Sequence, residues 1–290
     1  MIFIAGLVGV VAAALAYVAW RMQEPPENAP DRLRRDPARP LVACVGASVT
    51  HGRISVSYVS LLEARLGERF QFANAGRNGD LAFSLLQRLD AVVALRPEFV
   101  LLQIGTNDVN ASFSAQVARR FQRLKKLPVL PSRDFYRESL AAIVRQLRQR
   151  TDARVALLSL PLFGEDLESV FNERARSYNQ IIRDVASSEG VRYLPLHESM
   201  AAIIGSEPQS RPAPPSNRQV ALAQVQRFLL GRSLDEIGAR YGYRLLSDGV
   251  HLNTRGAAVV ADLIEAYLRE GSGSEPAPAG DRAVAPGIRR

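Results

Sequence analysis

The chain has 290 residues, 47% of them apolar and 23% charged, which is enough for one sizeable core with appendages. Its net charge of +8 comes mostly from arginine, but no basic stripe with interleaved aromatic residues accompanies it, so the usual nucleic-acid-binding patterns are excluded. The single cysteine, Cys44, excludes an internal disulfide. Three histidines without a Cys/His cluster offer no metal-ligand spacing, so we expect neither a metal nor another cofactor.

The first 20 residues carry no charged side chain, and about 20 apolar residues are what a bilayer core requires of a helix. Trp20 lies where an interfacial aromatic residue is expected, and Arg21 ends the run. We therefore expect residues 1–21 to be a single-pass membrane anchor; a cleaved signal peptide and a buried helix are the alternatives. The arginines that follow favour a cytoplasmic domain, but long domains cross regardless of such charge, so the side of the membrane stays open.

Three further segments divide the rest of the chain. Residues 22–40 mix prolines with charges and are typical of a linker, so we expect a tether rather than a packed element. The globular domain is expected at residues 41–269. From residue 270 to 290 the tail is mostly Gly, Ser, Pro, Ala and charge, a composition that predicts disorder.

Short apolar runs alternate with amphipathic stretches throughout this domain. The runs expected as strands are 41–45, 70–73, 99–104, 155–160 and 191–196, and the expected helices are 58–66, 81–95, 135–150, 170–186 and 256–268. Continuous apolar strands are typical of a parallel sheet covered on both faces by helices. The sequence therefore predicts an α/β fold, a flavodoxin-like three-layer α/β/α sandwich with a five-stranded parallel sheet, preceded by one transmembrane helix.

Two segments do not fit the alternation. Within residues 111–134, the five basic residues from 119 to 126 lie among apolar ones. A solvated helix or lid is the simpler interpretation, and a contact with a membrane surface or an anionic substrate is the alternative. Residues 205–245 begin as a Pro/Ser-rich loop and continue as a helical insert. Part of this insert, residues 233–243, imitates a helix-turn-helix but is too short and too enclosed to act alone, so we expect no DNA binding.

The chemistry centres on residues 247–253, Ser-Asp-Gly-Val-His-Leu-Asn, where Asp248 precedes His251 by three positions. A histidine that takes a proton from a hydroxyl needs its other ring nitrogen held and its cationic form stabilised, and a nearby carboxylate does both. Ser48 is the candidate nucleophile because it lies just past the first expected strand, where open α/β sheets place their sites.

Four short pieces follow strand ends or lie next to helix starts. They are Gly46-Ala47-Ser48, Asn78-Gly79-Asp80, Gly105-Thr106-Asn107-Asp108 and Asp248-Gly249-Val250-His251. Each piece alone is typical of a turn or a helix cap. The occurrence of all four pieces together, in this order, is much less expected by chance than the occurrence of any one of them.

This combination resembles the SGNH, or GDSL-type, hydrolase superfamily over roughly residues 41–268. The resemblance implies that Ser48 is the nucleophile and that His251 is the base, oriented by Asp248. The family's usual first block is Gly-Asp-Ser, and here the middle residue is Ala47, so a neighbouring carboxylate is lost. This departure leaves the rigidity of the loop and the substrate preference open.

The resemblance also implies an oxyanion hole, formed by the Ser48 N–H, the Gly79 N–H and the Asn107 side-chain amide. Acyl transfer builds negative charge on the carbonyl oxygen, and preorganised donors there are worth about 10²–10³ in rate apiece. The other polar candidates receive structural interpretations: His51 as a polar residue at a helix start, His197 as a buried structural residue and Asp108 as a brace for its own loop.

The expected activity is hydrolysis of carboxylic esters by an esterase, lipase or acylhydrolase that forms an acyl-enzyme and needs no cofactor. A non-catalytic, membrane-anchored protein that binds a glycan or lipid on the same fold is one alternative, and an acyltransferase is another. Small-molecule, lipid and glycan esters all remain open as substrates. The sequence does not determine the oligomeric state.

Overall fold

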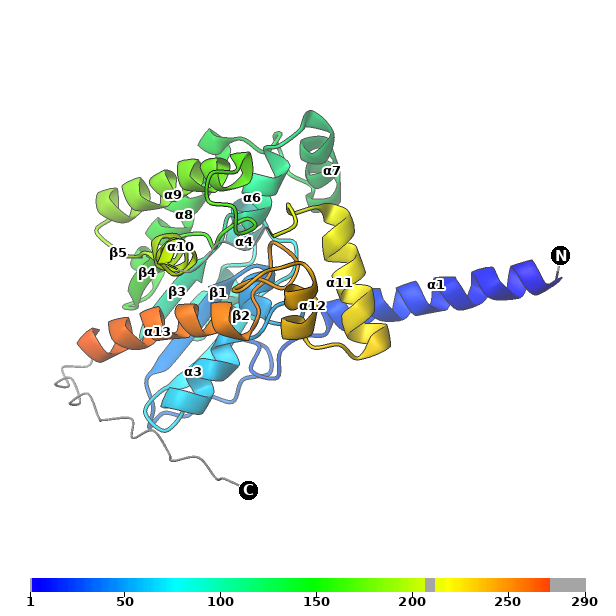
Figure 1. The fold of residues 1–290 in the computed structure, drawn as a ribbon. Coiled ribbons are helices and arrows are strands. Elements are labelled where there is room, and N and C mark those ends of the chain that lie inside the picture. The colour runs from blue at the N-terminus through cyan, green and yellow to red at the C-terminus, as the bar shows by residue number, and fades with distance from the viewer. Residues whose placement is uncertain (1, 207–211, 272–290) are drawn as a thin grey trace, which may run out of the picture.

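The computed structural model describes residues 2–206 and 212–271, so the expected disordered tail lies almost entirely outside the described residues. Its centre is a five-stranded sheet in the order β2-β1-β3-β4-β5, with every neighbouring pair parallel (Figure 1). The strands are β1 (Leu41–Gly46), β2 (Gln71–Gly76), β3 (Phe99–Gln103), β4 (Arg154–Leu158) and β5 (Arg192–Leu194). This strand order is the flavodoxin-like one, and the predicted sheet is confirmed.

Helices cover both faces of the sheet. The apolar cluster on one face joins the sheet to α3 (Tyr58–Leu66), α10 (Leu196–Ser206) and α13 (Thr254–Gly271). The cluster on the other face joins it to α4 (Ala82–Leu86), α8 (Arg133–Arg150) and α9 (Val170–Ser188). Alternate residues of β1 enter the two clusters, as the two-residue period of a strand requires. The three-layer architecture is therefore the predicted one.

Serine side chains cap the starts of six helices. Each hydroxyl accepts a hydrogen bond from a backbone N–H in the first turn, which satisfies a donor that has no partner inside the helix. The capped helices are α3, α7 (Ala115–Lys125), α8, α9, α11 (Asn217–Leu230) and α12 (Leu234–Arg240). The cap of α12 is a full capping box, because Glu236 also accepts from the backbone N–H of Ser233.

The helix expected at residues 81–95 is divided. It forms α4 and the single turn α5 (Asp90–Val93), with turn residues between them. Arg88 lies in this turn, and its Nε donates to Asp80 Oδ2 at 2.7 Å. The break in the helix thus coincides with an arginine that reaches the loop after β2.

The segment between α1 and β1 is packed, which corrects the expectation of a free tether for residues 22–40. The Asn28 side chain donates to Phe72 O at 3.1 Å, and Asn74 N donates to Asn28 O at 2.9 Å, so the segment lies along the edge of β2. Further along, Arg35 makes a forked contact with Glu98 at 2.7 and 3.0 Å. The prolines and charged residues here therefore belong to an ordered segment, which both side-chain and backbone hydrogen bonds hold against the domain.

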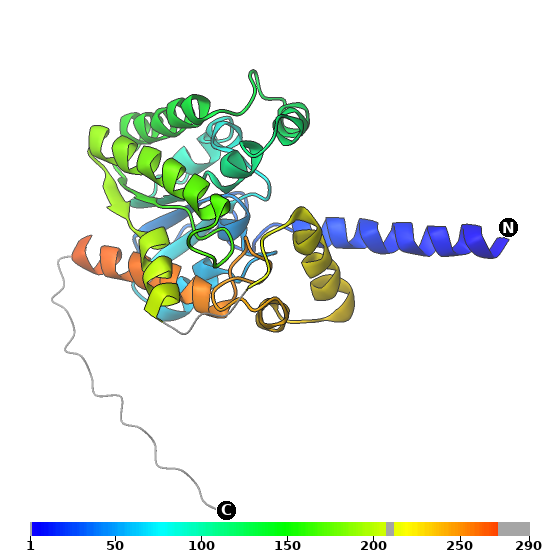
Figure 2. The ribbon, with the colours of Figure 1, turned by 45° about the horizontal axis from the view of Figure 1, so that its top comes forward.

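Helix α1 (Ile2–Gln23) projects from the domain, with its inner end beside α11 (Figures 1 and 2). Measured by length and hydropathy, no helix within the described residues qualifies as a membrane span. The transmembrane helix expected at residues 1–21 therefore receives no support from the structure.

Two glycines end the first two strands and allow the next element to approach closely. A Cβ on Gly76 would lie 2.2 Å from His51 N, and a Cβ on Gly46 would lie 2.3 Å from Gln103 O and from Thr50 Oγ1. Both distances are far below contact, so only bare backbone fits. These glycines let the short helix α2 (Ser48–His51) rest directly on the carboxyl ends of β1 and β2.

Candidate active site

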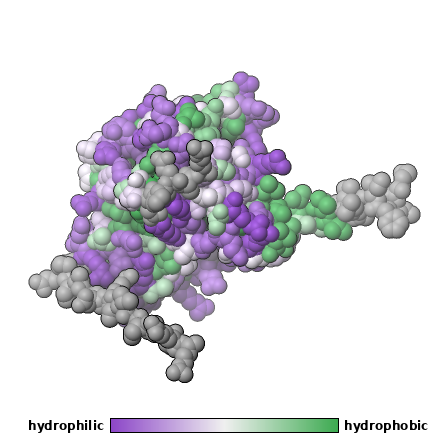
Figure 3. Space-filling view, in the orientation of Figure 1, coloured by the Kyte–Doolittle hydropathy of each residue, from purple (hydrophilic) through white to green (hydrophobic). Residues whose placement is uncertain are grey.

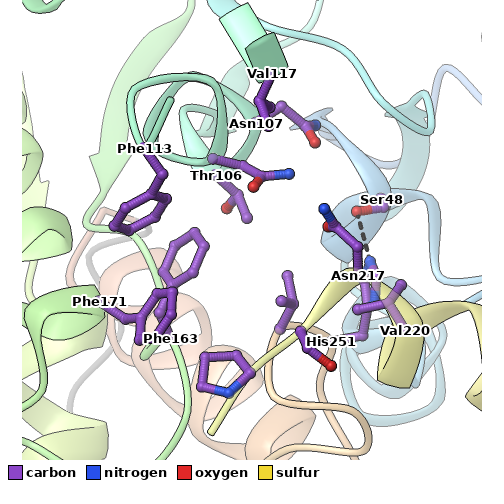
Figure 4. A pocket seen from close by; sticks show the side chains of 14 residues that line it. Ser48, Thr106, Asn107, Phe113, Val117, Phe163, Phe171, Asn217, Val220 and His251 are labelled. Carbon is purple, nitrogen blue, oxygen red and sulfur yellow. Dashed lines mark hydrogen bonds between the residues drawn. The ribbon is translucent and has the colours of Figure 1, made fainter. Parts of the chain in front are cut away.

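Ser48, Asp248 and His251 lie together at the carboxyl ends of the strands. His251 Nε2 is 3.0 Å from Ser48 Oγ, across a separation of 203 residues (Figure 4). His251 Nδ1 is 2.8 Å from Asp248 Oδ2. All three side chains are buried, and Asp248 is completely so. This geometry allows an imidazole to accept the serine proton while a carboxylate holds its other nitrogen.

The loop that carries Asp248 and His251 is closed on itself. Asp248 Oδ1 accepts the backbone N–H groups of Val250 at 3.1 Å and of His251 at 2.9 Å. Ser247 N donates to His251 O at 2.8 Å, and Leu246 pairs with Leu252 in an antiparallel bridge. The carboxylate therefore shapes the same loop whose histidine it contacts.

A glutamine from the helical insert also reaches this carboxylate. Gln224 lies on α11, is buried, and places its Nε2 3.4 Å from Asp248 Oδ2. Sequence reasoning missed this residue, because one glutamine in a helix carries no signal of a partner 24 positions away.

The departure at Ala47 has a structural explanation. Ala47 is buried and packs in the apolar cluster on one face of the sheet. Ser48 follows it as the first residue of α2 and keeps its 3.0 Å contact with His251. The missing carboxylate is thus replaced by apolar packing, and the position of the serine is retained.

The residues expected for the oxyanion hole are only partly brought together. Asn107 is the second residue of helix α6 (Thr106–Ala111) and lines the same pocket as Ser48 and His251. Its Nδ2 donates to Asp80 O at 2.9 Å, which commits one N–H of the amide and leaves the second. Gly79 has φ +75° and lies in the adjoining loop, but it is not among the described residues that line the pocket.

Charged residues support this loop, and sequence reasoning missed one of them, Arg88. The buried carboxylate of Asp80 pairs with Arg88 Nε at 2.7 Å and with Lys125 Nζ at 3.2 Å. Arg88 also donates to Ala75 O at 3.0 Å and to Gly46 O at 3.1 Å. One guanidinium therefore ties the loop after β2 to the ends of β1 and β2. The sequence offered no signal for it beyond the Asn-Gly-Asp turn.

Asp108 braces two loops, as expected. Its buried carboxyl accepts a hydrogen bond from the backbone N–H of Ala82, at the start of α4. The distance from Ala82 N to the nearer carboxyl oxygen, Oδ2, is 3.2 Å. Burial raises the pKa of Asp108 to about 8, and the nearby Asp80 carboxylate adds to the effect. Asp108 is therefore largely protonated at neutral pH, which is how a carboxyl is tolerated in this environment.

The other two histidines lie away from the pocket and are neutral. Burial, with a further contribution from the Arg88 charge, lowers the pKa of His51 to about 4. Burial likewise lowers the pKa of His197, whose backbone N–H donates to Ser159 Oγ at 2.8 Å. Neither side chain lines the pocket that contains Ser48.

The pocket next to Ser48 has a volume of about 260 Å³ and is mostly apolar. Three phenylalanines, Phe113, Phe163 and Phe171, stand opposite Ser48 and His251 (Figure 4). The remaining lining residues are Thr106, Asn107, Asn110, Val117, Pro215, Ser216, Asn217, Val220 and Val250. The two segments that did not fit the strand–helix alternation, around α7 and α11, thus supply walls of the pocket.

The GDSL-like Lipase/Acylhydrolase family matches residues 44–259. The chain belongs to this family. The family assignment confirms the resemblance seen in the sequence and supports the expected ester hydrolase activity. No curated protein sequence matches this GDSL-like hydrolase closely enough to serve as a relative.

Solved structures share the fold of this GDSL-like hydrolase at low identity. The acetyl xylan esterase AlAXEase is 20% identical with a TM-score of 0.56, over 79% of this chain and 99% of that one. The acetylxylan esterase Axe2 from Geobacillus stearothermophilus is 15% identical with a TM-score of 0.56, over 83% and 98%. The lipase/acylhydrolase from Enterococcus faecalis is 17% identical with a TM-score of 0.52, over 80% and 96%. At such identities the likeness shows the fold alone.

The raised pKa of Asp108 predicts a pH-dependent stability for this hydrolase. The contribution is fully present below about pH 3.9, where the unfolded carboxyl is also protonated, and is lost as the pH rises through about 8. Asp108→Asn keeps a neutral acceptor and removes the titration. The free energy of unfolding of the wild type, minus that of Asp108→Asn, should therefore fall from pH 4 to 8, by at most about 1.4 kcal/mol per pH unit.

Urea denaturation at several pH values measures this difference. Asp152→Asn is the matched control, because Asp152 is exposed and its curve should run parallel to that of the wild type. Parallel curves for the wild type and Asp108→Asn would show that Asp108 does not titrate as proposed.

Proposed function

We propose that this protein hydrolyses carboxylic esters with Ser48 as the nucleophile, His251 as the general base and Asp248 as the residue that orients His251. The observation that carries the proposal is the pair of contacts made by one imidazole, 3.0 Å to Ser48 Oγ and 2.8 Å to Asp248 Oδ2. Family membership supplies the reaction class.

In the first half of the reaction, His251 Nε2 takes the Ser48 proton as Oγ attacks the carbonyl carbon of the ester. The resulting imidazolium is stabilised by the carboxylate of Asp248 at its other ring nitrogen. His251 then donates this proton to the oxygen of the leaving alcohol, and the bond between carbonyl carbon and alcohol oxygen breaks. In the second half, His251 takes a proton from water as the water oxygen attacks the acyl carbon. His251 then donates this proton to Ser48 Oγ as the bond between the acyl carbon and Oγ breaks, which yields the acid and free serine.

Three N–H groups form the proposed oxyanion hole: the backbone N–H groups of Ser48 and Gly79 and the side-chain amide of Asn107. Two observations support it. Asn107 and Ser48 line one pocket, and the bond from Asn107 to Asp80 O joins Asn107 to the loop that contains Gly79. Donors held in place before the reaction need no reorganisation as the charge develops, so each is worth about 10²–10³ in rate.

Replacement of the nucleophile or the base should abolish turnover. We expect kcat/KM for p-nitrophenyl butyrate to fall about 10³-fold or more in both Ser48→Ala and His251→Ala, because each removes a member of the relay. A fluorophosphonate should label the folded wild type at Ser48 and should not label Ser48→Ala. Ser188→Ala, a change to an exposed serine, is the control and should keep full activity. Equal turnover in the wild type and Ser48→Ala would refute the proposed nucleophile, and a wild type that resists labelling would favour a binding protein on this fold.

The pocket lining indicates the acyl group. Apart from His251, no titratable side chain is among the described residues that line the pocket, and its far wall consists of phenylalanines. Phe113 and Phe171 pack ring against ring, with centroids 5.1 Å apart. An apolar wall favours an apolar group by removing its surface from water. We therefore propose an uncharged, apolar acyl group longer than acetyl.

Chain-length dependence tests this substrate class. Each methylene buried contributes about 0.8 kcal/mol, so kcat/KM should rise up to about fourfold per methylene from acetate to butyrate and hexanoate esters until the pocket is filled. Phe171→Ala removes part of the wall and should flatten this rise. Phe135→Ala, a change to a partly buried phenylalanine outside the pocket, should leave the profile unchanged. Highest activity on the acetate ester would contradict the assignment.

We also propose that α1 holds the protein at a membrane. Residues 2–20 carry no charge, and Val10, Leu15 and Trp20 are 68%, 55% and 61% exposed on a helix that projects from the domain. Removal of residues 2–14 leaves the end of α1 that contacts α11. The full chain should sediment with membranes after a high-salt wash, and the shortened chain should stay in the supernatant. Recovery of both chains in the supernatant would exclude the anchor.

A further inference from the structure

Exposed apolar side chains gather on one part of the surface. Among the residues whose exposure the structure describes, all the large exposed apolar side chains except Val170 lie on α1, on α7 and the loop after it, or on α11. Single exposed leucines are ordinary, but an apolar patch of this kind marks a binding surface. Outside α1, the patch consists of Leu124, Val129, Leu130, Leu222, Leu229 and Leu230.

These elements lie on one side of the molecule. Figures 1 and 2 both place α7 and α11 on the side from which α1 projects. Figure 3 shows apolar surface where α1 leaves the domain. Val117 of α7 and Val220 of α11 line the pocket that contains Ser48, so the two helices border the same opening. We call the exposed surface of residues 115–130 and 216–232 the α7–α11 face.

The charged residues of this face are all basic. Residues 111–133 contain six basic residues and no acidic one, and residues 212–234 contain three basic residues and no acidic one. Lys125 is paired with Asp80, but no ion pair joins Arg119, Arg120, Arg123 or Lys126 to any residue in the described part of the chain. These four side chains are exposed. The face therefore offers cations that its own protein does not neutralise.

Positive charge also accumulates where α1 meets α11. Arg21 and Arg53 both pair with Glu24, so two guanidinium groups share one carboxylate. Arg227 of α11 lies close to them, since burial and then the charges of Arg53 and Arg21 lower the pKa of Arg227. The Arg21 guanidinium also lies over the Phe228 ring, 5.9 Å from its centroid. The cationic surface thus continues from α11 to the base of α1.

We propose that the α7–α11 face docks on an anionic lipid surface. Its arginines and lysine pair with negative headgroups, and its leucines and valines enter the apolar layer beneath them, as in interfacial amphipathic helices. A soluble polyanion would match the cations but would leave the leucines in water. A protein partner that covered the leucines would need a strongly acidic surface as well. Only an anionic bilayer supplies both negative charge for the cations and an apolar layer for the leucines over the whole face.

Docking on this face brings the pocket bordered by α7 and α11 to the lipid surface. An ester that partitions into the bilayer then reaches Ser48 without crossing bulk water. This consequence rests on the proposed function, whereas the docking itself does not depend on catalysis.

The single tryptophan of the chain makes the docking measurable. In a Trp20→Phe background, Leu124→Trp and Leu230→Trp place one reporter on each helix of the face. Asp152→Trp is the control, because Asp152 is exposed in the loop between α8 and β4, at the amino ends of the strands. The full-length variants are mixed with vesicles of equimolar phosphatidylglycerol and dibrominated phosphatidylcholine, whose bromine atoms quench only tryptophans that enter the acyl layer.

We expect fluorescence at positions 124 and 230 to fall about twofold or more and fluorescence at position 152 to stay unchanged, because interfacial side chains enter about 5–10 Å below the headgroups. Vesicles of dibrominated phosphatidylcholine alone, or salt at about 1 M, should largely restore the signal, since screening then acts over about 3 Å. No quenching at either reporter, or equal quenching at all three positions, would overturn the docking surface. Equal quenching in the uncharged vesicles would overturn its anionic specificity.

Charge-reversal variants distinguish the effect of the α7–α11 face from the effects of the anchor and of the active site. Arg119→Glu with Arg120→Glu and Arg123→Glu should abolish quenching at position 124. Arg137→Glu with Arg145→Glu and Arg148→Glu changes the net charge equally on exposed positions of α8 and should not. Both triple variants should hydrolyse a water-soluble ester at the wild-type rate, so loss of docking is distinguishable from failure of the proposed hydrolysis. Binding of dextran sulfate by the wild type without lipid quenching would assign the face to a soluble polyanion and overturn the lipid proposal.

Discussion

A buried carboxylate is costly unless donors surround it, and the arrangement around Asp248 follows from that constraint. The carboxylate of Asp248 is fully buried and accepts two backbone N–H groups of its own loop, the His251 ring nitrogen and a longer contact from Gln224. The loop must therefore fold tightly around it. A helix of the insert must also pack over it. The same demand that shapes the loop aims His251 Nε2 at Ser48, so one compensated charge organises both local structure and chemistry.

The loops on the other side of Ser48 are organised by a second buried carboxylate and by bare backbone. Asp80 holds Arg88, whose guanidinium also binds carbonyl oxygens at the ends of β1 and β2. Gly46 and Gly76 leave no room for a side chain there, which lets α2 lie against the sheet. Packing of this kind is rigid, because neither a glycine contact nor a satisfied ion pair can slide without an energetic cost. The packing of α2 against the strand ends thus fixes Ser48, while the loop around Asp248 fixes His251.

The insert and α7 connect the pocket to the outer surface. Residues of both segments line the cavity, and both carry exposed apolar and basic side chains on the outside. A helix with one wall in the pocket and one face in solvent can transmit a surface contact to the substrate opening. Because these two segments contact both the pocket and the outer surface, they depart from the regular alternation of strands and helices. A helix that only covers a sheet needs a single apolar side.

The sequence by itself determined the five strands, most of the helices and three residues, Ser48, Asp248 and His251, that the fold brings within hydrogen-bonding distance. Apolar periodicity and strand-end motifs are local, and the carboxyl ends of parallel strands meet at one edge, so these features can be read in order along the chain. The tertiary structure alone decided three features: the packed course of residues 24–40, the contacts of Arg88 and Gln224, and the phenylalanine wall. Each depends on partners far apart in the chain, and no local pattern of residue types encodes such a meeting.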